Sequence, residues 1–131
     1  MPKNSVSHFE IYADDPEALS QFYTKLFDWS VELVPGMDYR FIKTVETGAA
    51  GPTQPGGING GMITRPQDYD GNAFVNYVNV ENLDQAVERG KGLGAKVMKP
   101  RTAVPGMGWF AMLLDPQGNG FAVWQMDKAA R

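Results

Sequence analysis

Residues 8–29 read HFEIYADDPEALSQFYTKLFDW. Apolar and polar side chains alternate at the start of this stretch, which predicts a strand over residues 6–13. Side chains of a strand point alternately to its two faces, so Phe9 and Ile11 share one face. His8, Glu10 and Tyr12 share the opposite face. The strand is therefore predicted to have an apolar face, suited to a core, and an opposite face with polar side chains that can bind a ligand or act in catalysis.

The same stretch predicts a helix directly after the strand. Asp15 is a good helix N-cap, and a proline is tolerated at the first helical position that follows. Apolar residues then recur at the spacing of one helical face. They are Leu19, Phe22, Tyr23 and Leu26. We expect Phe22 and Tyr23 to pack in the core.

The rest of the chain repeats this order. Further strands are expected at 29–34, 38–46, 58–64, 73–80, 95–99, 108–114 and 120–126, with a second helix capped by Asn82. The pairs Asp15 and Asn82, Leu26 and Leu93, and Ile11 and Val78 are each 67 residues apart. The tetrapeptide Val-Pro-Gly-Met occurs at 34–37 and again at 104–107, each time before an aromatic run. The sequence thus predicts two βαβββ modules with equivalent turns.

The motifs at both ends of the chain resemble the vicinal-oxygen-chelate superfamily, which includes glyoxalase I, bleomycin-resistance proteins and extradiol dioxygenases. The opening stretch carries His8 on a strand, Asp15 at a helix start and the run Phe27-Asp28-Trp29. The closing stretch LLDPQGNGFAVWQ, residues 113–125, resembles the second signature of that superfamily. Within the superfamily, the sequence most resembles the glyoxalase-like branch whose members are called hydroxylases.

The resemblance implies an α+β fold in which two βαβββ modules form a curved mixed sheet around a cup, with the helices outside. Residues 1–131 would then be a single domain, with module one at 5–64, a linker at 65–72 and module two at 73–127. A ferredoxin-like sandwich is the alternative, but it has one strand fewer between its helices. The glycine-rich segment 48–56 is expected to be a mobile loop.

The metal enzymes of the superfamily hold a divalent ion with side chains from both modules. His8 matches the first of these positions and is the single histidine of the chain. The matching positions in module two are Val75 and Ala122, which have no donor atoms. The last strand of module one offers only the amide of Asn59. Because one histidine cannot complete a metal shell, we predict neither a tightly bound metal nor another cofactor.

Composition excludes several classes of function. The chain has no cysteine, so disulfides, thiolate metal sites and a cysteine nucleophile are absent. The net charge of −3, with no basic stripe, gives no reason to expect nucleic acid. No apolar run approaches a membrane span, and residues 1–10 lack a signal peptide core, so a cytoplasmic location is expected. A symmetric homodimer is expected because it is the commonest oligomer.

A small-molecule ligand is the expected partner, since apolar walls with a few polar groups are typical of such sites. The candidate ligand-binding residues are His8, Glu10, Tyr12, Tyr39, Phe41, Asn59, Trp109 and Trp124. Cup-lining hydrogen bonds without chemistry are the simpler interpretation of His8 and Glu10. Core or interface packing is the simpler interpretation of about half of the aromatic residues.

Two functions remain open. The first is a metal-free protein that binds an aromatic or planar ligand, as the bleomycin-resistance branch does. The alternative is a glyoxalase-like enzyme, a hydroxylase, isomerase or lyase, that uses His8 and Glu10 as an acid–base pair or a weakly held divalent metal. A purely structural dimer module is the third interpretation.

Overall fold

The computed structural model describes residues 4–131, which divide into two compact units. We call His8–Phe74 module one, and residues 4–7 together with Val75–Arg131 module two; a strand that crosses this boundary is described with the module that holds most of its residues. Residues 65–72 cluster with module one in this division. Neither helix in the described part of the chain is long and apolar enough to cross a membrane.

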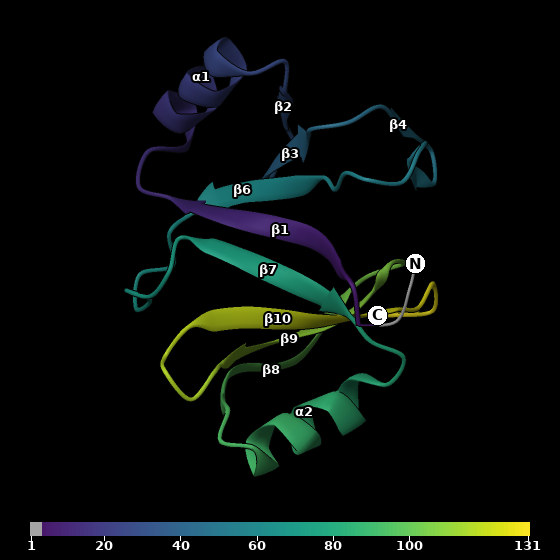
Figure 1. The fold of residues 1–131 in the computed structure, drawn as a ribbon. Coiled ribbons are helices and arrows are strands. Elements are labelled where there is room, and N and C mark those ends of the chain that lie inside the picture. Colours follow the sequence, from purple (N-terminus) through teal and green to yellow (C-terminus); the bar gives the residue numbers. More distant parts are fainter. Residues whose placement is uncertain (1–3) are drawn as a thin grey trace. The chain divides into compact units, whose positions relative to one another are not determined.

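Module one has the expected βαβββ order with a small hairpin inserted (Figure 1). Its elements are β1 (Val6–Ala13), α1 (Pro16–Leu26), β2 (Ser30–Leu33), β3 (Arg40–Lys43), β4 (Thr47–Gly48), β5 (Gly51–Pro52) and β6 (Gly60–Thr64). The strands follow the order β2-β3-β6-β1. Strands β1 and β6 are parallel, and the other neighbours are antiparallel. The β4–β5 hairpin lies in the glycine-rich segment that the sequence predicts as a loop.

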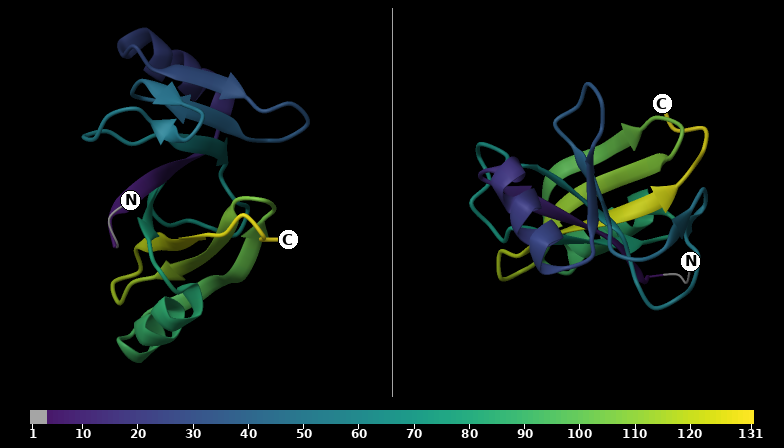
Figure 2. Two further views of the ribbon diagram at one scale, coloured as in Figure 1. Left: turned by 90° about the vertical axis from the view of Figure 1, so that its right-hand side faces the viewer. Right: turned by 90° about the horizontal axis from the view of Figure 1, so that it is seen from above.

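Module two repeats the order without the hairpin. Its elements are β7 (Phe74–Asn79), α2 (Leu83–Gly92), β8 (Lys96–Val104), β9 (Gly108–Leu114) and β10 (Gly120–Met126). The strands follow the order β7-β10-β9-β8, with β7 and β10 parallel. Each helix lies against one side of its own sheet (Figures 1 and 2). The α+β class and the mixed sheets are confirmed, and the ferredoxin-like alternative is wrong. The arrangement of the modules around a cup stays a prediction.

The core of module one confirms the assignment of the two faces of β1. Ile11, Ala13, Ile42 and Met62 are buried together. Phe9, Leu19, Tyr23, Trp29 and Val31 pack against them. His8, Glu10 and Tyr12 alternate with the core residues of β1 and so lie on the face away from α1. This polar face therefore carries the candidate functional groups of β1.

Two positions on the predicted helical stripe of α1 do not enter the core. Phe22 is 55% exposed and Leu26 is 57% exposed. The expectation that Phe22 is a core residue is therefore wrong. Tyr23 instead supplies the aromatic contact to the core and stacks on Trp29 at 5.2 Å. The short helix reaches the sheet through a narrower stripe than its sequence pattern indicates.

The core of module two lies between α2 and its sheet. Leu83, Ala111, Leu113 and Val123 are buried there. Trp109, Phe121 and Val97 are among the residues that pack against this cluster. Leu93 follows α2 and is 72% exposed, although the periodicity places it on the core face. The helix ends before it, with Gly94 at a φ of +104° as the stop.

Local signals account for the helix starts and for the repeated turns. The Asp15 carboxylate accepts from the Ala18 amide at 3.1 Å, and the Asn82 side chain accepts from the Gln85 amide at 3.0 Å. In each Val-Pro-Gly-Met turn the Met amide donates to the Val carbonyl, at 3.2 Å for Met37 and 3.0 Å for Met107. Gly36 and Gly106 both have a positive φ, at +77° and +75°. The two tetrapeptides are thus equivalent turns, as predicted.

The closing signature also has a structural explanation. The Asp115 carboxylate accepts from the amides of Gln117 at 2.9 Å and Asn119 at 3.0 Å. Hydrogen bonds from Asn119 and the neighbouring amides hold the pKa of Asp115 below its usual range. The motif therefore closes the turn between β9 and β10.

Candidate functional site

The face of module one away from α1 gathers three polar side chains. His8 Nε2 lies 2.5 Å from Glu10 Oε2. The Tyr39 hydroxyl donates to the same carboxylate oxygen at 2.8 Å and lies 3.5 Å from His8 Nε2. The Glu10 side chain is 7% exposed, whereas that of His8 is 31% exposed. We call these residues the His8–Glu10–Tyr39 cluster. It combines a buried carboxylate with an accessible imidazole.

The glycine-rich last strand makes room for this cluster. In the sheet, Gly61 lies between Glu10 of β1 and Phe41 of β3. A Cβ at Gly61 would overlap the Tyr39 hydroxyl and would lie 2.7 Å from Glu10 Oε2. Only a glycine at this position lets the tyrosine reach across β6 to the carboxylate. Gly61 therefore serves to leave space for the Tyr39 side chain, a role that the sequence alone does not reveal.

Aromatic side chains continue the same face. Phe41 is half-buried and lies on the same side as Tyr39, which directly precedes β3, because positions two apart in an extended chain point the same way. Tyr12 is buried and makes an edge-to-face contact with Tyr69 at 5.2 Å. Tyr69 comes from the loop after β6, and its hydroxyl donates to Asn72 Oδ1 at 2.8 Å. Sequence reasoning missed Tyr69 because a loop residue carries no periodicity.

Burial raises the pKa of Tyr12 to about 12, with smaller contributions from Glu10 and Tyr69. The folded protein thus holds this phenol proton more tightly than the unfolded chain does. The stabilisation is complete below pH 10 and is lost as the pH rises towards 12. We expect the free energy of unfolding to fall by roughly 2–3 kcal/mol across this range because of Tyr12.

Urea unfolding at a series of alkaline pH values checks this expectation. The Tyr12→Phe variant should show a shallower decline than the wild type, whatever its stability at neutral pH. Equal slopes for the two proteins would show that the phenol does not govern the decline.

Asn59 is placed by the structure in a supporting role. Its side-chain oxygen accepts from the Thr44 amide at 2.9 Å, and its nitrogen donates to the Thr47 hydroxyl at 2.7 Å. The residue is 6% exposed. These bonds tie the start of the β4–β5 hairpin to the residue just before β6. Both ends of the amide are thus engaged within module one.

The two candidate tryptophans lie on opposite faces of module two. Trp124 is on the face away from α2, where a Cβ at Gly108 would lie 2.6 Å from its ring. Trp109 packs against the helix-side core, so its placement on the ligand face needs correction. Its indole donates to Asp127 at 3.0 Å, and the Arg101 guanidinium lies 4.1 Å from its ring centroid. Trp109 shares its strand face with the small Ala111, so the alternation of side chains along this strand does not indicate that this face is the core.

Phe110 and Tyr77 lie on the face of module two that points away from α2, opposite to Trp109. Phe110 pairs with Trp124 across the strands, and Tyr77 pairs with Ala122. The two rings lie 6.2 Å apart. Sequence reasoning missed both residues. Residues 109–114 are apolar on both faces of the strand, so their alternation does not show that Ala111 and Leu113 are buried and Phe110 lies on the other face.

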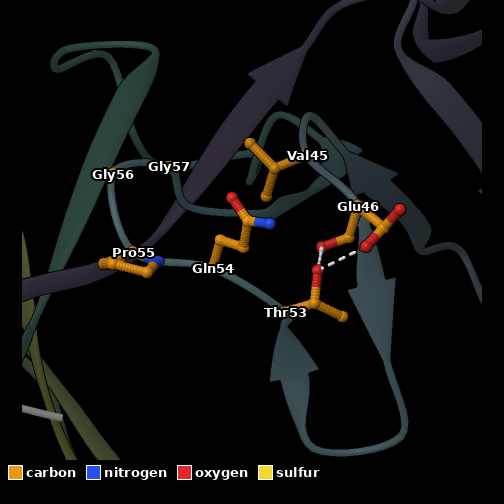
Figure 3. Close-up of a pocket in the computed structure, with 7 residues that line it drawn as sticks. All are labelled: Val45, Glu46, Thr53, Gln54, Pro55, Gly56 and Gly57. Atoms are coloured by element: carbon orange, nitrogen blue, oxygen red, sulfur yellow. Dashed lines mark hydrogen bonds between the residues drawn. The ribbon is translucent and has the colours of Figure 1, made fainter.

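Two surface hollows lie elsewhere. One, of about 470 Å³, is formed by residues flanking the β4–β5 hairpin, where Thr53 donates to the Glu46 carboxylate at 2.8 Å (Figure 3). The other, of about 740 Å³, lies between α2 and β8 and includes Asp84, Lys96 and Arg101. Neither is lined by any of the predicted ligand residues.

The donor atoms do not fit the divalent metal of the chelating enzymes. Within residues 4–131, no group of three or more His, Asp or Glu side chains is arranged to hold an ion. His8 and Glu10 are bonded to each other, and Val75 and Ala122, at the other matching positions, have only hydrocarbon side chains. A tight site needs three or four donors on one ion.

Residues 8–124 match the sequence profile of the Glyoxalase-like domain family. The chain belongs to this family. The resemblance of the opening and closing motifs to the vicinal-oxygen-chelate superfamily is thereby confirmed. The matched range includes the His8–Glu10–Tyr39 cluster and ends at Trp124.

Curated relatives of the glyoxalase-like chain are longer than the chain itself. "Putative glyoxylase CFP32" of Mycobacterium tuberculosis is 27% identical over 117 residues, which cover 87% of this chain and 41% of that protein. The anthracycline biosynthesis protein DnrV of Streptomyces peucetius is 27% identical over 132 residues, covering 89% and 45%. The chain thus spans less than half the length of these relatives.

Solved structures share the fold at low sequence identity. A hypothetical protein from Bacillus halodurans C-125 matches with a TM-score of 0.64 at 12% identity, covering 99% of each chain. The Mn(II)-bound glyoxalase of Novosphingobium aromaticivorans matches with a TM-score of 0.60 at 16% identity, covering 98% of this chain and 40% of that one. These likenesses support the glyoxalase-like fold and no particular reaction.

Proposed function

We propose that this glyoxalase-like protein binds a small aromatic or planar molecule on the face of module one that carries the His8–Glu10–Tyr39 cluster. The observation that supports the proposal is the placement of this hydrogen-bonded cluster beside Phe41 on a sheet face cleared by Gly61. Small-molecule sites combine apolar surface with a few polar groups that fix orientation. Phe41 supplies a ring for stacking, and His8 supplies an accessible polar group.

The name of one relative is consistent with such a ligand. DnrV is named as an anthracycline biosynthesis protein, and anthracyclines are planar aromatic compounds. A planar ligand would lie flat along the sheet, with its edge towards the polar cluster. The aromatic side chains would then contribute by stacking, and the cluster would select the orientation.

Binding is proposed to occur without a tightly held divalent metal. The hydrocarbon side chains of Val75 and Ala122 and the mutual bond of His8 and Glu10 support this part of the proposal. Calorimetric titration with Ni, Zn, Fe or Mn is expected to show no micromolar binding. A stoichiometry near one metal per chain at that affinity would contradict it.

Proton-transfer catalysis is the second candidate function. The short contact between His8 and the buried Glu10 favours it, because a carboxylate that orients an imidazole is a common acid–base arrangement. In this function His8 would exchange a proton with the ligand, while Glu10 would orient the ring and stabilise its charged form. The reaction would be a redox-neutral one that proton transfer can complete, as in a glyoxalase-like isomerase or lyase.

One experiment separates the two functions. A thermal-shift screen of small aromatics and antibiotics identifies a ligand, since saturation at a hundred times Kd stabilises a protein by about 2.7 kcal/mol. His8→Ala and Glu10→Gln are then titrated with this ligand and assayed for its turnover. Binding without chemistry predicts at least a roughly tenfold weaker affinity in both variants and no turnover in the wild type.

The exposed Glu88→Gln variant on α2 is the matched control and should bind like the wild type. Unchanged affinity with abolished turnover in the cluster variants would favour the enzyme. Unchanged affinity with no turnover in any protein would refute the proposed site.

A further inference from the structure

We infer that the ligand of this face is an anionic planar aromatic, and that Lys43 is the residue that selects its negative charge. The inference rests on the proposed function and adds the chemical class of the ligand. Lys43 lies on β3 and is half-buried. Its ammonium group lies 5.6 Å from the centroid of the Phe41 ring.

Lys43 shares the ligand face with the His8–Glu10–Tyr39 cluster. Strand β3 places Ile42 in the core and bonds Arg40 to Glu17 of α1, so both point towards the helix. Tyr39, Phe41 and Lys43 therefore point the other way. Tyr39, directly before β3, and Phe41 and Lys43 on β3 thus present a phenol, an aromatic ring and an ammonium group in sequence along the ligand face.

Lys43 brings to this face a positive charge that no neighbouring carboxylate of the described residues neutralises. No carboxylate within the described residues lies within 4.0 Å of the Lys43 ammonium group. The Glu10 carboxylate is already engaged by His8 and Tyr39. Glu32 is the other acid on this face, because it pairs with Phe41 from the edge strand β2. It is exposed and accepts from the Ser30 hydroxyl at 3.4 Å.

Module two carries the same pair of groups on its corresponding face. The Lys99 ammonium group lies 5.5 Å from the centroid of the Phe110 ring. Phe110 points away from the helix-side core of module two, as Phe41 does in module one. A ring and an adjacent ammonium group can bind an aromatic anion together: the ring contacts the aromatic system, and the ammonium group attracts the negative charge. This pairing of an ammonium group with a ring occurs in both modules, which supports an anionic aromatic ligand over a cationic one.

Two probes with the same ring test the inference. The fluorescence of 2-naphthoate and of the uncharged 2-naphthamide is titrated with wild-type protein, Lys43→Met, Glu32→Gln and the exposed control Lys128→Met. The wild type should bind naphthoate more tightly, and added salt should weaken naphthoate alone. Lys43→Met should weaken naphthoate binding roughly two- to fivefold and leave naphthamide unchanged. Glu32→Gln should strengthen naphthoate binding, and Lys128→Met should change neither.

The outcomes separate this inference from the proposed function. If both probes bind equally and Lys43→Met leaves their ratio unchanged, the ligand is not selected for negative charge and only the inference fails. A loss of naphthoate affinity in Glu32→Gln would also contradict it. If neither probe binds to any of the proteins, the inference fails and the planar ligand of the proposed function is contradicted as well.

Discussion

Gly61→Ala is expected to disrupt the candidate site more than any other change of comparable size. The added methyl group would overlap the Tyr39 hydroxyl and approach Glu10 Oε2. The tyrosine must then move, and its hydrogen bond to the buried carboxylate is lost. We expect the affinity for a planar ligand to fall at least roughly tenfold, since a hydrogen bond to a charged group contributes about 1.5–3 kcal/mol. Crowding should lower the free energy of unfolding by about 1–3 kcal/mol.

Gly92→Ala is the matched control for this substitution. Gly92 ends α2, and a Cβ there would meet no atom within 4 Å. Because alanine favours the helix, the control should keep ligand affinity and gain up to about 1 kcal/mol of stability. Urea unfolding and ligand titration of both variants measure these effects. Wild-type affinity in Gly61→Ala would show that the Tyr39–Glu10 bond does not hold the site.

Leu113→Ala is expected to cause the largest loss of stability. Leu113 is 1% exposed and belongs to the buried cluster between α2 and the sheet of module two. Removing its side chain leaves a cavity and loses the transfer free energy of the buried methyl groups. Substitutions of this kind lower the free energy of unfolding by about 2–5 kcal/mol. Denaturant unfolding at neutral pH measures the difference.

Leu93→Ala provides the same chemical change at an exposed position. Leu93 is 72% exposed, so its truncation should alter stability by less than about 0.5 kcal/mol. The sequence pattern alone assigns Leu93 to the core. A comparable loss in the two variants would therefore mean that α2 extends and buries Leu93, contrary to the structure.

The fold could be predicted largely from local signals. Strand boundaries at residues 6–13, 108–114 and 120–126 agree with the structure, and Asp15 and Asn82 cap the helices as expected. Caps and Pro-Gly turns depend on neighbours within four residues, so a sequence reveals them directly. The exposure of Phe22 could not be predicted, because helical periodicity indicates an apolar stripe without showing how much of the stripe the sheet covers.

The candidate site could be predicted only in part. The two-residue period of β1 places His8 and Glu10 on one face, and the structure confirms that they are in contact. Their third partner, Tyr39, is 29 residues from Glu10 along the chain and reaches it only because β6 has a glycine between them. Such a contact depends on strand register, which the sequence does not specify. For the same reason the structural roles of Asn59 and Trp109 emerge only from the fold.

The location of ligand binding tests the central claim most directly. Backbone amide shifts of the ¹⁵N-labelled protein are followed by NMR during titration with the planar ligand from the thermal-shift screen. Binding at the proposed face predicts that the largest shifts fall on residues 8–12, 39–43 and 60–63, which surround the His8–Glu10–Tyr39 cluster. Shifts confined to residues 53–57 beside the β4–β5 hairpin, or to the hollow between α2 and β8, would contradict it.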